Sequence, residues 1–254
     1  MLDKGFINDI KSVKKMLHGK HQTLFFSATI DKTIKKLAYS QVKSTAIRIQ
    51  ISPEDPVSKN VSHFVMVVEM DDKRFFLERF INENPDSRMM VFVRTRVRAE
   101  RVAKAMERAG IAVLAIHGEK DQTHRSQVMQ GFKGGEANVL IATDVSARGI
   151  DIPDIHYVIN YDMPVEPETY VHRIGRTGRG FNKGVAISFC SSEEKERLAA
   201  VQALVKKPIE EIKISKRDYA RAIESPSEAT SAEALIREQE AWENKKRKKK
   251  KKHR

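Results

Sequence analysis

From about residue 61 onward, short apolar runs alternate with longer segments in which apolar residues recur at helical spacing. The apolar runs are predicted strands at 64–69, 89–93, 112–116, 138–142, 156–160 and 184–189. The segments between them are predicted helices near 72–83, 96–109, 122–132, 167–175 and 192–205. Two runs, 89–93 and 139–142, are apolar at every position, as strands of a parallel sheet covered by helices must be. The pattern predicts an α/β fold with a doubly wound, mostly parallel sheet.

The first 60 residues have a different pattern. It predicts helices near 6–17 and 31–40 and short strands at 23–26 and 46–50, which are too few to close a sheet. Pro53 and Pro56, with two acidic residues between them, are typical of a linker. We therefore expect a partial domain at 1–51, a linker at 52–60, a complete domain at 61–214 and a polar, basic, disordered tail at 215–254.

The net charge of +13 is concentrated in the tail. Residues 245–254 contain nine Lys or Arg, which leaves +4 for the first 244 residues. We expect this run to attract polyanions, and a solubilising or localisation role is the alternative. The single cysteine, Cys190, ends an apolar run and is expected to be buried. No apolar run approaches the roughly 18 residues of a membrane span, so we expect a soluble, cytoplasmic protein without membrane contact.

The octapeptide His172–Arg179 is the most distinctive segment, with arginines at 173, 176 and 179 and glycines at 175 and 178. Arginines three residues apart share a helix face, and glycines let a ligand approach the backbone closely. Guanidinium groups in that setting suit the oxygens of a phosphoryl group, although a solvated helix end is the alternative. Other polar groups follow the predicted strands, at the carboxyl ends where such sheets bind ligands. These are Thr95, His117-Gly118, Thr143-Asp144 and Asp151.

Five motifs in order resemble those of the DEAD-box ATP-dependent RNA helicases of superfamily two. They are Ser27-Ala28-Thr29, Val91-Phe92-Val93-Arg94-Thr95, His117-Gly118 with Gln122 and Arg125, the run from Ala142 to Ile152, and the octapeptide. The resemblance covers roughly residues 1–210 and concerns the C-terminal portion of these helicases, with the RhlE-like group as the most similar. It implies a RecA-like C-terminal helicase domain preceded by part of a first RecA-like domain.

The resemblance implies a role for each motif. Arg176 and Arg179 would be arginine fingers that neutralise charge on the transferred γ-phosphoryl group, and His172 would join the ATP and RNA sites. Gly149 and Asp151 would lie at the nucleotide, with Asp151 at the ribose. The residues that would hold the RNA backbone are Thr95, Gly118, Gln122, Arg125, Thr143 and Asp144, whereas Ser27 and Thr29 would couple the two domains.

Each of these side chains also has a plain structural alternative. Thr143 and Asp144 could cap the following helix, and Ser27 or Thr29 could cap the helix that begins near residue 31. His117 could be a hydrogen-bonded core histidine, and Arg148 could belong to a surface turn. The order of the motifs, more than any one side chain, favours the functional interpretation.

Other motifs of the family are missing from the sequence. It contains no G-x-x-x-x-G-K-[ST] phosphate loop, no Asp-Glu-Ala-Asp tetrad and no adenine-reading glutamine motif. The opening run Met1-Leu2-Asp3-Lys4-Gly5-Phe6 resembles the segment that follows the tetrad in the family, so we expect a piece of a longer protein. The resemblance implies ATP with Mg²⁺ as cofactor, and this chain has no predicted metal ligands. We therefore expect negligible ATP hydrolysis by the chain alone.

The family implies RNA as the partner, bound through its backbone and hence without sequence preference, by a monomer. A non-catalytic RNA-binding module is one alternative. A superfamily-two DNA helicase is another, and the His at the start of the octapeptide disfavours it because several DNA-acting relatives begin that motif with Gln.

Overall fold

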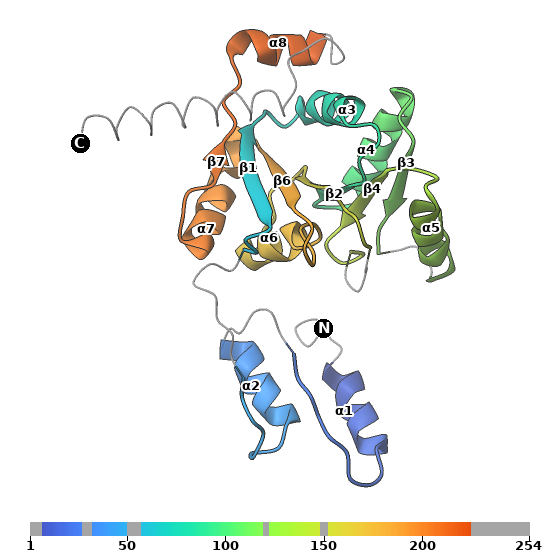
Figure 1. Ribbon diagram of the computed structural model, residues 1–254, viewed down its shortest axis with the longest axis vertical. Coiled ribbons are helices and arrows are strands. Elements are labelled where there is room, and N and C mark those ends of the chain that lie inside the picture. The colour runs from blue at the N-terminus through green and yellow to red at the C-terminus, as the bar shows by residue number, and fades with distance from the viewer. Residues whose placement is uncertain (1–6, 27–31, 50–56, 119–121, 148–151, 225–254) are drawn as a thin grey trace, which may run out of the picture. The chain divides into compact units, whose positions relative to one another are not determined.

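The computed structural model describes residues 7–26, 32–49, 57–118, 122–147 and 152–224 (Figure 1). The chain divides into two compact units, residues 1–53 and 54–254. Within the described ranges, none of the helices combines the length and the apolar character that a membrane span requires.

The second unit is built on a seven-stranded sheet in which all the strand pairings are parallel. Its strand order is β3-β4-β2-β5-β6-β1-β7. Parallel neighbours need long crossover connections, and helices provide them here except between β4 and β5, where the described residues contain no helix. The strands are β1 (Val61–Val67), β2 (Met89–Val93), β3 (Val113–Ile116), β4 (Val139–Thr143), β5 (Tyr157–Asn160), β6 (Gly184–Cys190) and β7 (Glu210–Glu211).

Helices cover both faces of this sheet, which confirms the predicted doubly wound α/β fold. One face packs against α3 (Lys73–Glu83), α4 (Arg96–Arg108) and α8 (Lys216–Glu224). The other packs against α5 (Gln122–Gly134), α6 (Pro167–Ile174) and α7 (Lys195–Val205), which follows a 3₁₀ turn at Ser192–Glu194. Successive strand residues point to opposite faces, so Met90 and Phe92 join one core layer and Met89, Val91 and Val93 the other.

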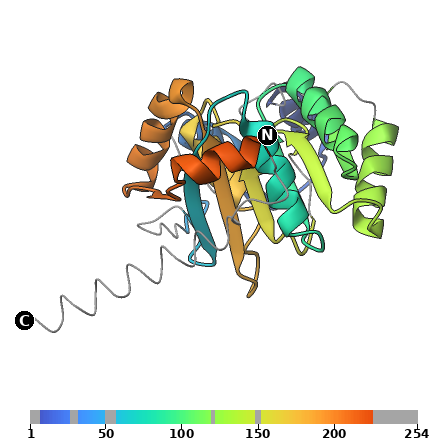
Figure 2. The same cartoon turned by 90° about the horizontal axis from the view of Figure 1, so that it is seen from above.

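The predicted elements of the second unit are found, with β1 beginning three residues earlier than expected. The expectation of a disordered tail from residue 215 is wrong for 216–224, which form α8 beside α3 (Figures 1 and 2). The Tyr219 hydroxyl accepts the Glu69 N–H at 2.9 Å and donates to the Asp72 carboxylate at 2.8 Å. The Tyr219 ring lies 5.0 Å from that of Phe76, and Ala222 is fully buried. These contacts give a polar segment enough burial to fold.

The first unit contains α1 (Ile7–Met16) and α2 (Lys32–Gln41). The Lys14 ammonium donates a hydrogen bond of 2.8 Å to the Gln41 carbonyl and so connects the two helices. The predicted strands at 23–26 and 46–50 are wrong as far as the structure describes them, because 23–26 and 46–49 are not in strand conformation. A strand needs a neighbour to satisfy its backbone groups, and two short runs do not make a sheet. Apolar side chains of the unit stay exposed, among them Leu24, Phe26, Ile47 and Ile49.

Candidate functional site

Several motif residues gather at the carboxyl ends of neighbouring strands. Thr95 follows β2 and caps α4, its hydroxyl accepting the Arg98 N–H at 3.2 Å. Thr143 ends β4, and His117 with Gly118 follows β3. Because β3, β4 and β2 are adjacent in the sheet, these residues share one edge. The sequence predicts this grouping, and we call this edge, where the strands end, the carboxyl edge.

A buried serine that sequence analysis did not single out fixes the loop after β4. The Thr143 N–H donates to the Ser146 hydroxyl at 3.1 Å. That hydroxyl lies 2.8 Å from the Ile116 carbonyl and 2.9 Å from the Thr143 carbonyl. One side chain therefore joins the ends of β3 and β4. Its only signal was its place two residues after Asp144 in the motif.

Arg173, the first arginine of the octapeptide, is buried and connects several segments at the carboxyl edge by hydrogen bonds. Its guanidinium is 1% exposed and donates two bonds to the Asp144 carboxylate, at 2.6 and 2.8 Å. It also donates to the Asp162 carbonyl at 2.7 Å and to the Asn160 side chain at 3.3 Å. The carboxylate of Asp144, 29% exposed, thus has a protein partner, and its predicted contact with RNA stays a prediction.

A second buried network ties the ends of β1, β2, β5 and β6 together. The Asp162 carboxylate accepts the Arg94 N–H at 2.9 Å and lies 2.9 Å from the Arg98 Nε. The Lys73 ammonium donates to the Tyr161 carbonyl at 2.8 Å and to the Glu194 carboxylate. Burial lowers the pKa of Lys73, and Glu194 opposes that shift. Nothing in the sequence distinguished Lys73 or Glu194 from surface residues of helices.

Arg176 and Arg179 lie at the opposite ends of the strands, where the strands begin. The helix α6 runs from the carboxyl edge back toward these strand starts. The Thr177 hydroxyl donates to the Ile155 and His156 carbonyls, directly before β5. A Cβ on Gly178 would lie 2.6 Å from the Val61 side chain at the start of β1, and its φ is +66°. The expected grouping at the carboxyl ends did not include the octapeptide, and these two arginines lie apart from it.

A cavity of about 350 Å³ opens beside the two arginines. Both side chains are half-buried, and the Arg179 Nε donates to the Gly175 carbonyl at 3.2 Å, which holds this side chain against the end of α6. Lys183 and Asn182 also line the cavity, and Asp154 is the one carboxylate among its described lining residues. Three cations and an amide form a donor set that fits the phosphates of a nucleotide. Among the described residues, no three His, Cys, Asp or Glu side chains are grouped closely enough to hold a metal ion.

The structure leaves several predicted site residues without a test. Gln122 begins α5, Arg125 is half-buried on the same helix, and His172 is exposed on α6. The roles given to these three stay predictions. Four further site residues lie outside the described residues, namely Ser27, Thr29, Gly149 and Asp151.

Comparison with protein families and curated sequences points to one group. Residues 72–181 match the helicase conserved C-terminal domain. The DEAD-box ATP-dependent RNA helicase CshA of Bacillus subtilis is 36% identical over 220 residues, which are 87% of this chain and 44% of CshA. The ATP-dependent RNA helicase DBP2 of Saccharomyces cerevisiae is 38% identical over 228 residues, 86% of this chain and 42% of DBP2. The chain spans less than half the length of these relatives.

Solved structures agree with this grouping. S. cerevisiae Dbp5 bound to RNA and ADP BeF3 gives a TM-score of 0.78 at 29% identity, covering 90% of this chain and 61% of that one. The E. coli DEAD-box protein SrmB, bound to RraA, is 37% identical with a TM-score of 0.58, over 62% of this chain and 92% of that one. The RhlE-like assignment stays a prediction. The motifs, the sheet order and these relatives together establish that the chain belongs to the DEAD-box family of RNA helicases and corresponds to its C-terminal portion.

Proposed function

We propose that this chain is the half of an ATP-dependent RNA helicase that supplies arginine fingers to the ATP site and backbone contacts to RNA. The observation that carries the proposal is the placement of Arg176 and Arg179 beside the cavity of about 350 Å³. The groups that hold Mg²⁺ and the β and γ phosphates come from the portion of the helicase that this sequence does not contain.

The two arginines act by electrostatics. ATP with Mg²⁺ supplies the phosphoryl group, and the guanidinium groups stabilise the negative charge that develops on it. Such positioning requires a rigid support. Thr177 is anchored to the two carbonyls before β5, and Gly178 is packed against the start of β1, so the backbone between the arginines is fixed.

The carboxyl edge supplies the RNA contacts. The amide groups at the N-terminus of α4 and the hydroxyl groups of Thr95 and Thr143 suit phosphate and ribose oxygens. None of these contacts reads a base, so binding is independent of sequence. The lysine-rich tail adds a salt-sensitive attraction.

The helix α6 connects the two edges. Arg173 binds Asp144 at the carboxyl edge, and Arg176 begins the finger segment one turn further along the chain. A displacement of α6 caused by RNA at one edge would therefore move the arginines at the other. His172 lies on the same helix, directly before Arg173 in sequence.

ATP hydrolysis by two forms of the protein tests the proposal. We expect the chain alone to give only background hydrolysis, with or without single-stranded RNA. In the second form, the N-terminal portion of a DEAD-box relative, up to its Asp-Glu-Ala-Asp tetrad, is placed ahead of residue 1. This form should hydrolyse ATP in response to RNA, and Arg176→Ala or Arg179→Ala should lower the rate by roughly a thousandfold.

Lys133→Ala, an exposed cation on α5, is the control and should keep the rate. Hydrolysis by the chain alone that is lost in Arg176→Ala would mean that the phosphate site is complete within these residues. An extended form whose activity is insensitive to both arginine substitutions would refute the role as fingers. RNA binding without any restored hydrolysis would favour a non-catalytic RNA-binding module.

A further inference from the structure

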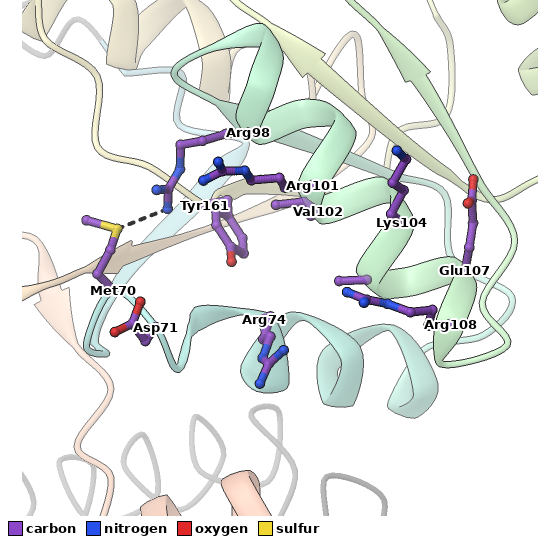
Figure 3. A pocket seen from close by; sticks show the side chains of 11 residues that line it. Met70, Asp71, Arg74, Arg98, Arg101, Val102, Lys104, Glu107, Arg108 and Tyr161 are labelled. Carbon is purple, nitrogen blue, oxygen red and sulfur yellow. Dashed lines mark hydrogen bonds between the residues drawn. The ribbon is translucent and has the colours of Figure 1, made fainter.

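A second hollow lies between α3 and α4, on the face of the sheet opposite α6 (Figure 3). It encloses about 840 Å³. Its charged lining is strongly unbalanced, because two acidic residues, Asp71 and Glu107, face five basic ones. The basic residues are Arg74 from α3 and Arg98, Arg101, Lys104 and Arg108 from α4. We call this hollow the α3–α4 groove.

Three of the basic side chains are available to a ligand. Arg98 is engaged by Asp162 and by the Met70 sulfur. Arg101, Lys104 and Arg108 are exposed, and within the part of the chain that the structure describes they make no hydrogen bond or ion pair. Their spacing of three and four residues places them on one side of α4. The groove therefore presents a row of three cations without an ion-pair partner among the described residues, in a lining where basic residues outnumber acidic ones.

This row continues from a residue that is predicted to contact RNA. Thr95 caps the N-terminus of α4, and the cations follow along the same helix toward Arg108. At a rise of 1.5 Å per residue, the 13 residues of α4 extend over roughly 20 Å. A nucleic acid strand held at Thr95 could thus follow the helix away from the carboxyl edge.

We propose that the α3–α4 groove binds the phosphate backbone of RNA that flanks the strand held at the carboxyl edge. This inference rests on the proposed function, since it extends the same RNA site. An acidic protein segment is less well suited to the groove. Of its apolar lining, Val102 is 5% and Tyr161 4% exposed, and Met70 and Ala105 are only half-buried, so no fully exposed apolar residue lines it. Protein interfaces rely on an accessible apolar centre and are depleted in lysine, whereas polyphosphate binding needs only the row of cations.

Binding of a short and a long RNA tests the proposal. The probes are fluorescent single-stranded RNAs of about 8 and about 20 nucleotides, and the full chain is titrated at several salt concentrations. The variant is Arg101→Gln with Lys104→Gln, which keeps helix-forming side chains and removes two charges. The matched control is Lys133→Gln with Lys195→Gln, two exposed cations on α5 and α7, on the opposite face.

We expect the groove variant to bind the long RNA roughly fivefold to tenfold more weakly, and the short RNA within about twofold of the parent chain. Losing two phosphate contacts should also reduce the slope of log K against log salt by about 1.4 for the long RNA. The control should show neither length dependence nor the change of slope. Equal urea midpoints of all variants will establish that the fold is intact.

The outcomes separate the two proposals. A parent chain that binds neither RNA refutes the proposed RNA site and the groove with it. A parent chain that binds both, with the groove variant unchanged, refutes the groove alone. Equal weakening on both RNAs, or equal weakening by the control, would also overturn the groove, because it would indicate a general effect of net charge.

Discussion

At the residue scale, Arg173 should be the most costly side chain of the octapeptide to remove. Arg173→Ala would leave the Asp144 carboxylate and the Asp162 carbonyl without their donor, and we expect a loss of about 3 kcal/mol in the free energy of unfolding. Urea denaturation measures this loss. Arg173→Lys keeps the charge but lacks the bidentate geometry. Its free energy of unfolding should therefore lie between those of the parent chain and Arg173→Ala.

A double-mutant cycle with Asp144→Asn checks the cause. If the ion pair accounts for the effect, the two substitutions together should cost much less than their sum. Additive losses, or a loss below 1 kcal/mol for Arg173→Ala, would show that the pair contributes little.

Two glycines, Gly178 within the octapeptide and Gly180 directly after it, separate backbone conformation from close packing. Gly178 and Gly180 have φ of +66° and +62°, so alanine is strained at both. A Cβ at Gly180 would meet nothing within 4 Å, whereas one at Gly178 would lie 2.6 Å from Val61. We expect Gly180→Ala to lower the free energy of unfolding by about 1 kcal/mol. Gly178→Ala should lower it by about 1–3 kcal/mol more, as measured by urea unfolding. Equal losses would mean that β1 moves aside freely.

Cys190 offers a chemical test of burial, since it is the only cysteine of the chain. Burial, with a smaller effect of Glu194, raises the pKa of its thiol to about 11. The thiolate is the reactive form, and at pH 8 only roughly one folded molecule in a thousand has it. We expect the folded protein to react with a disulfide reagent at least a hundredfold more slowly than the urea-unfolded chain. The rate should rise with pH toward 11.

The same shift has a consequence for stability. Because the pKa is higher in the folded protein, the neutral thiol stabilises the fold fully below about pH 9, and this contribution is lost as the pH rises toward 11. Cys190→Ala should remove that part of the alkaline destabilisation. A thiol that reacts equally fast in the folded and unfolded protein would contradict the burial of this strand end.

At the element scale, α8 should be an integral part of the second unit. A chain that ends at residue 214 lacks the Tyr219 contacts with Glu69, Asp72 and Phe76. We expect its second unit to melt roughly 5–10 °C below that of a chain that ends at residue 224. Tyr219→Phe removes only the hydroxyl bonds and should cost about 1 kcal/mol. Equal melting temperatures of the two shortened chains would mean that α8 rests on α3 without stabilising it.

The elements that the sequence predicted correctly are those with a strong local pattern. β2 and β4 are apolar at every position because both of their faces are covered, and this made them recognisable. By contrast, β7 is two residues long, and α8 is mostly polar with few buried side chains. The apolar runs at 23–26 and 46–50 resembled strands locally, but strand formation depends on neighbours that a local pattern does not reveal.

The candidate site, like the fold, could be predicted from the sequence only where the pattern is local. Motif order identified the arginines and Thr95, since each motif is a local run. The partners of Arg173 come from segments 11 to 29 residues away, and Lys73 meets Glu194 across 121 residues. Such pairs depend on the order of the strands in the sheet, which cannot be seen in any single stretch of sequence. The separation of Arg176 from the carboxyl edge could not be predicted for the same reason, because it depends on the direction in which α6 runs.

At the scale of the whole molecule, the two units should differ sharply in stability. Of the 13 large apolar residues that are exposed among those described, eight belong to residues 1–53. The second unit has two extensive core layers, one on each face of its sheet. A unit that buries so little apolar surface gains little free energy from folding.

Limited proteolysis should therefore cut first within residues 1–53 and leave a resistant fragment that begins near residue 57. Removing residues 1–56 should leave the urea midpoint of the second unit unchanged and should reduce the binding of a dye that detects exposed apolar surface. A protease-resistant first unit would contradict this view. So would a lower midpoint after its removal, since the second unit would then depend on the helices α1 and α2 for its stability.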